Sequence, residues 1–225
     1  MQVSDVADTV FLFDVDNTLL DNDRVAEELR QHLATQLGDS AEHQYWVLFE
    51  EVRSELGYAD YLGALQRYRM KYPYDNQLRE ISSFLLNYPF EERLFPRALE
   101  VLEAFADRGT VTILTDGDVV FQPHKIERSG IGRAVRDHVM LYVHKEQELA
   151  DVEARYPAEH YVLIDDKVRI LASVKAQWGS RVTTVFPRQG HYALDAESVA
   201  KYPPPDCEID HIADLLALDA FGPVR

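Results

Sequence analysis

The stretch Phe11-Leu-Phe-Asp14-Val-Asp16-Asn-Thr18-Leu-Leu-Asp21 decides the fold of this chain. It begins in an apolar run, Val10 to Phe13, and continues into polar residues that include acids at alternate positions. A short apolar run rich in aromatic and branched residues is typical of a strand buried on both faces. The pattern therefore predicts a buried strand that delivers Asp14 and Asp16 at its carboxyl end.

Four similar apolar runs occur later in the chain. They are Val111 to Thr115, Val139 to Val143, Tyr161 to Ile164 and Val182 to Phe186. Segments with helical periodicity separate them, for example one that Pro96 opens and Gly109 ends. Strands that alternate with helices form right-handed crossovers and a parallel sheet covered on both faces. We therefore predict an α/β fold with a doubly wound, Rossmann-like core.

The first two strands are separated by about 90 residues, too many for a single crossover helix. Within this gap Val25, Leu29, Leu33 and Leu37 recur at helical spacing. Further helical stretches follow, at Tyr45 to Leu56, Tyr61 to Met70 and Leu78 to Tyr88. We predict a catalytic core of residues 1–19 and 93–225, with a helical cap of residues 20–92 inserted after the first strand.

The predicted cap is rich in aromatic residues. Residues 41–90 hold 11 of the aromatic side chains in a chain with 2 Trp, 12 Tyr and 10 Phe. A small helical bundle needs bulky residues to fill its core, so most of them are predicted to be buried there. Whether some tyrosine hydroxyls, with Arg53, Arg67 or Arg69, face a ligand stays open at this point.

Composition excludes several classes of protein. The 225 residues include 39 Asp+Glu against 23 Lys+Arg, a net charge of −16, and no basic stripe that would bind nucleic acid or a lipid surface. The single cysteine, Cys207, excludes an intramolecular disulfide, a cysteine zinc site and an iron–sulfur cluster. With neither a signal-like N-terminus nor a run of about 20 apolar residues, we expect a soluble cytoplasmic protein. Its oligomeric state stays open.

Polar residues follow four of the predicted strands, at the edge where ligands bind in open parallel sheets. After Asp14 and Asp16 come Thr115, then Lys145, then the pair Asp165-Asp166. Carboxylates crowded at such an edge stay ionised together only if cations offset their charge. Oxygen ligands favour Mg²⁺, whereas the absence of a His-Glu-x-x-His pattern disfavours zinc.

Two other interpretations of the first motif are weaker. An EF-hand also begins with alternate acids, but Leu19 replaces its glycine, Val25 replaces its terminal glutamate, and a strand precedes the loop. Asp14 and Asp16 could also be simple turn residues at a strand end. The ordered residues Thr115, Lys145 and Asp166 behind them favour a catalytic site instead.

These motifs resemble those of the haloacid dehalogenase superfamily, whose first motif is Asp-x-Asp-x-Thr after an apolar strand. The resemblance covers the core and implies a hydrolase with a helical cap. By it, Asp14 is the nucleophile and Asp16 the general acid and base. Thr115, with the backbone N–H groups of Asp116 and Gly117, holds the phosphoryl group, and Lys145 neutralises charge. Mg²⁺ is held by Asp14, the Asp16 carbonyl and Asp166, with Asp165 as a further acid.

Asp16 favours phosphoryl transfer over dehalogenation, because an alkoxide leaving group benefits from a proton and a halide does not. Lys145 precedes Glu146 rather than the usual proline, so Lys125 stays a rival for the lysine role. Asp116 must point away from the anion or weaken its binding. Asp165 could instead serve the start of the following helix.

We therefore expect a Mg²⁺-dependent phosphatase of small phosphorylated metabolites that acts through an aspartyl phosphate. A sugar phosphomutase is the alternative reaction. A protein that binds phosphate or Mg²⁺ without turnover is the alternative class, and haloacid dehalogenation comes last.

Overall fold

The computed structural model describes residues 7–74 and 78–218. Six parallel strands form one sheet in the order β3-β2-β1-β4-β5-β6. Their bounds are β1 (Ala7–Phe13), β2 (Thr110–Asp116), β3 (Val139–Tyr142), β4 (Ala158–Ile164), β5 (Val182–Pro187) and β6 (Cys207–Ile209). The strand order reverses beside β1, so the chain after β1 leaves the sheet at the switch point where such folds bind ligands.

Alternate residues of β1 face opposite sides of the sheet. Phe11 and Phe13 pack with the helices α5 (Ala98–Ala106), α6 (Phe121–Ser129) and α7 (Ile131–Ala134). Val10 and Leu12 pack with α8 (Leu149–Arg155) and α9 (Val168–Trp178) on the other face. The α/β, doubly wound class predicted from the sequence is confirmed.

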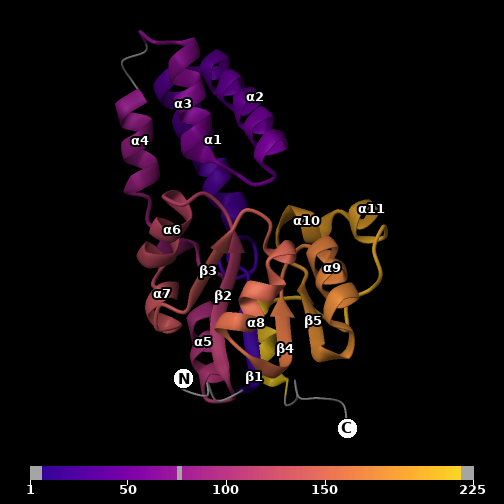
Figure 1. Cartoon of the computed structure of the whole chain (residues 1–225). Coiled ribbons are helices and arrows are strands. Elements are labelled where there is room, and N and C mark those ends of the chain that lie inside the picture. The colour runs from indigo at the N-terminus through magenta and orange to yellow at the C-terminus, as the bar shows by residue number, and fades with distance from the viewer. Residues whose placement is uncertain (1–6, 75–77, 219–225) are drawn as a thin grey trace.

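Between β1 and α5, the described part of the chain forms four α-helices. They are α1 (Asn22–Leu37), α2 (Asp39–Leu56), α3 (Tyr61–Lys71) and α4 (Leu78–Leu86), hereafter the helical insertion. Figure 1 shows them beyond the tips of the strands, at the edge where the polar motifs end. The side chain of Asp21 accepts a hydrogen bond from the Arg24 N–H at 2.9 Å and caps α1, which starts the insertion directly after the first motif.

The insertion is held together largely by aromatic residues. Tyr45, Phe49, Tyr61 and Tyr68 are buried, and the rings of Phe49 and Tyr61 stack with centroids 4.9 Å apart. Tyr74 is 92% exposed and is an exception. Most of these residues therefore fill the bundle, as predicted.

The sequence reading missed one strand, β6, because its three residues follow a proline-rich segment and carry no apolar run. Residues 1–6 and 219–225 of the predicted core and 75–77 of the predicted cap lie outside the described residues. Two short helices, α10 (Gly190–Leu194) and α11 (Ala196–Val199), follow β5. Among the described helices, none has the length and apolar character needed to cross a membrane.

Candidate active site

Lys145 is the centre of a buried ionic cluster at the carboxyl edge of the sheet. Its side chain is 1% exposed, and its ammonium lies 2.5 Å from Oδ1 of Asp14 and 2.6 Å from Oδ2 of Asp165. The third contact is the Leu114 carbonyl at 3.1 Å. Burial alone would lower the Lys145 pKa, but the Asp14 and Asp165 carboxylates outweigh it and raise that pKa above its usual range. Lys145 is therefore a fixed cation beside Asp14.

Thr18 links the first motif to Asp166, which follows β4. Its hydroxyl lies 3.4 Å from Oδ2 of Asp14, to which it donates, and accepts a hydrogen bond from the Asp166 N–H at 3.1 Å. The backbone of Asp14 is held as well, because its N–H donates to the Ile164 carbonyl at 3.0 Å. The ends of β1 and β4 are thus locked side by side.

Asp166 is the least satisfied group in the site. Its side chain is 1% exposed, and neither carboxylate oxygen has a hydrogen-bond partner within the described residues. Burial raises the pKa of this carboxyl well above its usual value, with a further rise from Asp165 and Asp14, although Lys167 opposes it. Buried polar atoms are rarely left without partners, so this carboxylate calls for a cation or a proton.

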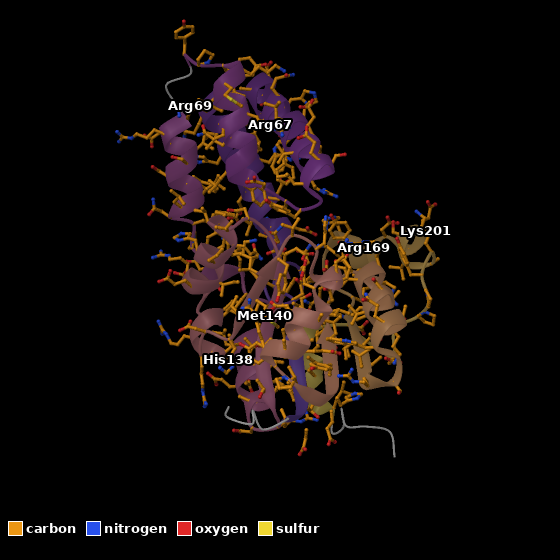
Figure 2. The ribbon with its side chains drawn as sticks, viewed as in Figure 1. Arg67, Arg69, His138, Met140, Arg169 and Lys201 are labelled. Atoms are coloured by element: carbon orange, nitrogen blue, oxygen red, sulfur yellow. The ribbon has the colours of Figure 1, made fainter. Side chains whose placement is uncertain are left out.

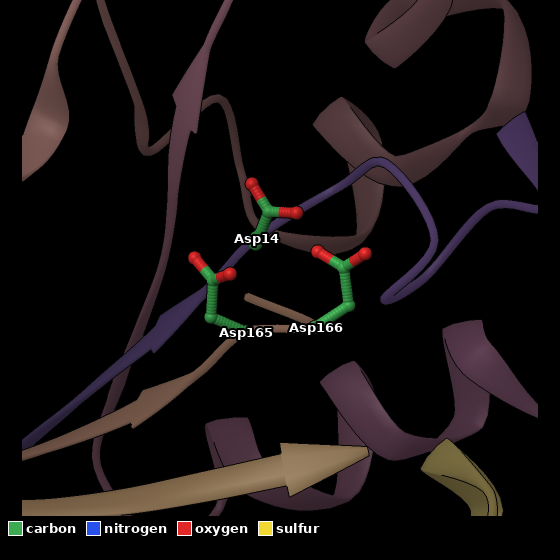
Figure 3. Close-up of side chains that lie close together, drawn as sticks. All are labelled: Asp14, Asp165 and Asp166. Carbon is green, nitrogen blue, oxygen red and sulfur yellow. The ribbon is translucent and has the colours of Figure 1, made fainter. Parts of the chain in front are cut away.

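Asp14, Asp165 and Asp166 each offer an oxygen within 4.8 Å of the others, and within 7–74 and 78–218 they alone form such a cluster. Figure 3 shows the three carboxylates converging from the tips of β1 and β4. Asp165 is already engaged, because Oδ2 contacts Lys145 and Oδ1 accepts from the Lys167 N–H at 2.8 Å. The oxygen donors therefore fit a hard divalent cation, and Asp166, whose two oxygens have no partner among the described residues, is the freest of the three.

The second motif lies at the end of β2. Thr115 is 1% exposed and accepts a hydrogen bond from the Gln122 side chain at 3.0 Å. Asp116 turns one oxygen to the Lys145 N–H at 2.7 Å, and burial raises its pKa. The Gly117 N–H donates to the Tyr142 carbonyl at 3.1 Å and continues the ladder between β2 and β3. This corrects the expectation that the Gly117 N–H is available to a phosphoryl group.

Lys145 and Lys125 were the two candidate lysines from the sequence. Both lie at the carboxyl edge of the sheet, but each contacts a different aspartate. Lys145 contacts Asp14, whereas Lys125 contacts Asp16 at 2.6 Å. The Asp16 carboxylate is therefore separate from the Asp14-Asp165-Asp166 cluster. Asp118 accepts from the Val120 and Phe121 N–H groups at the start of α6, so its charge serves the helix.

A cavity of about 750 Å³ lies between this edge and the helical insertion. The core contributes Asp16, Asp116, Asp166, Lys167, Arg169, Tyr192 and Lys201, and the insertion contributes Trp46, Phe49, Arg53, Tyr58 and Tyr61, among others. Figure 2 shows Arg169 and Lys201 on the core below the insertion, and Arg67 and Arg69 up on the insertion itself. Of the three arginines left open by the sequence, only Arg53 lines the cavity.

Two residues at the site, Gln122 and Lys167, were not predicted from the sequence. Gln122 is the second residue of α6, and a Cβ on Gly117 would come within 2.9 Å of its side chain, so glycine permits this close approach. Lys167 follows Asp166 directly, and its pKa is raised because the carboxylates of Asp166 and Asp14 outweigh burial, which alone would lower it. The position of Lys167 directly after the predicted metal ligand Asp166 was the sequence feature that could have identified it.

The chain is similar to known proteins over most of its length. Residues 9–182 match the haloacid dehalogenase-like hydrolase family. A Burkholderia xenovorans LB400 protein described as a haloacid dehalogenase-like hydrolase is 54% identical, with a TM-score of 0.91, over 94% of this chain and 96% of that one. None of the curated proteins matches the chain.

More distant solved structures share the fold. The L-2-haloacid dehalogenase of Xanthobacter autotrophicus with chloropropionic acid covalently bound is 17% identical, with a TM-score of 0.62, over 93% of this chain and 97% of that one. The HAD-hydrolase YfnB of Bacillus subtilis, bound to magnesium, is 19% identical, with a TM-score of 0.61 and the same coverages. At these identities the likeness concerns the fold alone.

Proposed function

This chain belongs to the haloacid dehalogenase-like hydrolases, and from that premise we propose that it is a Mg²⁺-dependent phosphatase of small phosphorylated metabolites of the cytoplasm. The observation that carries the proposal is Asp16. It lies two residues after Asp14, lines the cavity and remains partly exposed, at 23% of its side chain. A halide leaves without a proton, whereas an alkoxide does not, so a second carboxylate there favours phosphate esters over haloacids.

In the proposed reaction a carboxylate oxygen of Asp14 attacks phosphorus. The new Asp14 O–P bond forms as the bond to the leaving oxygen breaks, and Asp16 gives that oxygen its proton. Asp16 then takes a proton from water, which attacks phosphorus, releases phosphate and restores the Asp14 carboxylate. Lys145 stabilises the negative charge that develops on the transferring group, and the Thr115 hydroxyl orients it.

The residues that would hold Mg²⁺ are Asp14, Asp166 and the Asp16 carbonyl, with Asp165 beside them. Bound there, the cation would supply charge neutralisation to the phosphoryl oxygens. The unsatisfied carboxylate of Asp166 supports this assignment, because a divalent cation would compensate its buried charge.

The test is hydrolysis of 4-nitrophenyl phosphate with Mg²⁺ by the wild-type chain and by Asp14→Asn. We expect steady phosphate release from the wild type and a loss of at least about 10³-fold in the variant, because the attacking oxygen is gone. Undiminished turnover by Asp14→Asn would contradict the mechanism. Halide release from a 2-haloacid, with no release of phosphate from a broad ester panel, would instead establish dehalogenation.

The same panel separates the two phosphoryl-transfer reactions. A phosphatase releases inorganic phosphate from a hexose phosphate, whereas a phosphomutase returns the group to the sugar as an isomeric ester. Binding of phosphate or Mg²⁺ with no turnover of any ester would identify a regulatory protein.

A further inference from the structure

Lys125 is a buried cation that the proposed chemistry does not use. It lies on α6 and is 1% exposed. Its ammonium lies 2.6 Å from Oδ1 of Asp16 and 3.0 Å from Oδ1 of Asn22. Burying an ammonium is costly unless it is paired and hydrogen-bonded. The fold thus keeps a buried lysine whose only carboxylate partner among the described residues is Asp16.

This ion pair engages only one oxygen of Asp16. Oδ1 accepts from Lys125, whereas no donor in the described part of the chain reaches Oδ2. Asp16 also lines the cavity, where the leaving group of a substrate would lie. An aspartate side chain can otherwise turn among several rotamers. Fixing Oδ1 therefore fixes the direction in which Oδ2 is offered to the cavity.

Side chains of the helix α6 donate hydrogen bonds to residues of both the first and the second motif. Gln122 donates to the Thr115 hydroxyl, and Lys125, three residues later on the same face of the helix, donates to Asp16. The cations are also divided, because Lys145 contacts Asp14 and Lys125 contacts Asp16. The buried face of α6 thus supports the groups that would bind and protonate the substrate.

Lys125 also links Asp16 to the helical insertion. Asn22 is the first residue of α1, and its side-chain amide donates to the Tyr61 hydroxyl at 3.3 Å, at the start of α3. A chain of polar contacts thus runs from Tyr61 through Asn22 and Lys125 to Asp16. The orientation of Asp16 therefore depends on where the insertion lies.

We propose that Lys125 is a positioning residue, which holds the Asp16 carboxylate so that Oδ2 meets the leaving oxygen of the substrate. The inference rests on the proposed phosphatase function, in which Asp16 is the general acid. Proton transfer needs the heavy atoms within about 2.6–3.2 Å, so a carboxylate free to rotate would spend less time in reach.

The experiment compares phenyl phosphate with 2,4-dinitrophenyl phosphate, because dinitrophenoxide leaves readily without a proton and phenoxide does not. The measured quantity is kcat/KM, which reports cleavage of the ester bond. For Lys125→Met we expect a fall of about 10- to 100-fold with phenyl phosphate, but less than about threefold with the dinitrophenyl ester. Lys125→Arg, which keeps the cation, should recover part of the loss.

Two further variants sharpen the result. Asp16→Asn should show the same leaving-group pattern, and the double variant with Lys125→Met should be no slower than Asp16→Asn alone, because both changes remove one function. Lys175→Met is the control, since it breaks another lysine–aspartate pair, at 2.7 Å to Asp206. The Lys175 ammonium also contacts the carbonyl of Val182, the first residue of β5, so this pair lies at the amino end of the strands and not at the site edge. Lys175→Met should change kcat/KM for neither ester.

An equal fall on both esters, or additive effects in the double variant, would overturn the proposal. If Lys125→Met does not fold, Lys125→Gln takes its place with the same expected pattern. A crystal structure of the Lys125 variant decides the placement of Asp16 without any activity. Turning of the Asp16 carboxylate supports the inference, and an unchanged carboxylate refutes it. If the wild type hydrolyses neither ester, the proposed function fails, and the crystal structure alone decides the role of Lys125 in placing Asp16.

Discussion

The carboxyl edge of the sheet and the helical insertion bury opposite kinds of side chain. At the edge, Asp14, Lys145, Asp165 and Asp166 are at most 3% exposed and carry charge. In the insertion the buried side chains are mainly apolar and aromatic, and the ion pairs lie at the surface, as between Arg67 and Glu55. One wall of the cavity is therefore built by electrostatics and the other by packing.

The two kinds of buried side chain should tolerate substitution differently. At the edge, Asp14 and Asp165 share the Lys145 ammonium, so removing that cation leaves both buried carboxylates uncompensated, whereas Asp166 has no partner among the described residues. A surface ion pair loses little when broken, because water replaces the partner. We expect the edge to fix the chemistry and the insertion to select the substrate, and three predictions test this division.

The largest effect is expected from Lys145→Met compared with Arg67→Met. Loss of the Lys145 ammonium leaves Asp14 and Asp165 without their shared cation, at a cost of about 3–5 kcal/mol in the free energy of unfolding. It should also lower kcat by about 10²- to 10³-fold. Arg67→Met should leave both quantities unchanged. Urea unfolding measures the free energy of unfolding, and turnover of 4-nitrophenyl phosphate measures kcat. Similar losses in Lys145→Met and Arg67→Met would contradict the proposed difference between the edge and the insertion.

An intermediate effect is expected from Asp166→Asn. Burial in the folded state raises the pKa of Asp166, so the folded state binds a proton on the Asp166 carboxyl more tightly than the unfolded state does. Its ionisation therefore lowers stability as pH rises from about 3.9 through the folded pKa. Without metal, the variant should be more stable than the wild type, and more so at about pH 7.5 than at about pH 5.

Mg²⁺ should reverse this ranking. It should raise the melting temperature of the wild type and not that of Asp166→Asn, since the metal binds the folded carboxylates. Urea unfolding with EDTA at both pH values measures the metal-free stability. Thermal melts with and without Mg²⁺ measure the stabilisation by the metal. A variant that Mg²⁺ still stabilises fully would remove Asp166 from the metal site.

The smallest effect is expected from Arg53→Met. The Arg53 guanidinium lines the cavity 5.7 Å from the centre of the Tyr192 ring, across from the core. Its loss should raise KM up to about fivefold for esters that carry a second anionic group, the size of a partly exposed ion pair. Because Arg53 is outside the ionic cluster, kcat should not change. Arg67→Met is again the control, and a fall in kcat with unchanged KM would show the insertion acting on chemistry.

The sheet was predictable because its strands are short apolar runs and parallel strands leave few topologies. The runs at Val10 to Phe13 and Tyr161 to Ile164 lie within β1 and β4, which pair in register from Val10 with Tyr161 to Phe13 with Ile164. That register alone sets Asp14 beside Asp165. The convergence of the acids at one edge followed from strand order and could be predicted without coordinates.

The partners of the polar side chains could not be predicted in this way. Lys145 was the predicted site lysine, but Lys125 stayed a rival in sequence, since it follows the Thr115 strand at a plausible distance. Gln122 looked like an ordinary helix residue, and β6 was too short to show a pattern. The ion pairs of both lysines join residues more than 100 positions apart, as between Lys125 and Asp16, where the intervening helices set the geometry.

The parallel sheet, the helical insertion and the acids at the strand tips follow from the amino-acid sequence, because apolar periodicity and crossover handedness act through residues near one another in the chain. Tertiary structure alone decided that Lys145 neutralises Asp14 while Lys125 holds Asp16, and that Asp166 is left without a donor. The physical reason is that ion pairs act over a few ångströms, and only packing brings distant residues that close.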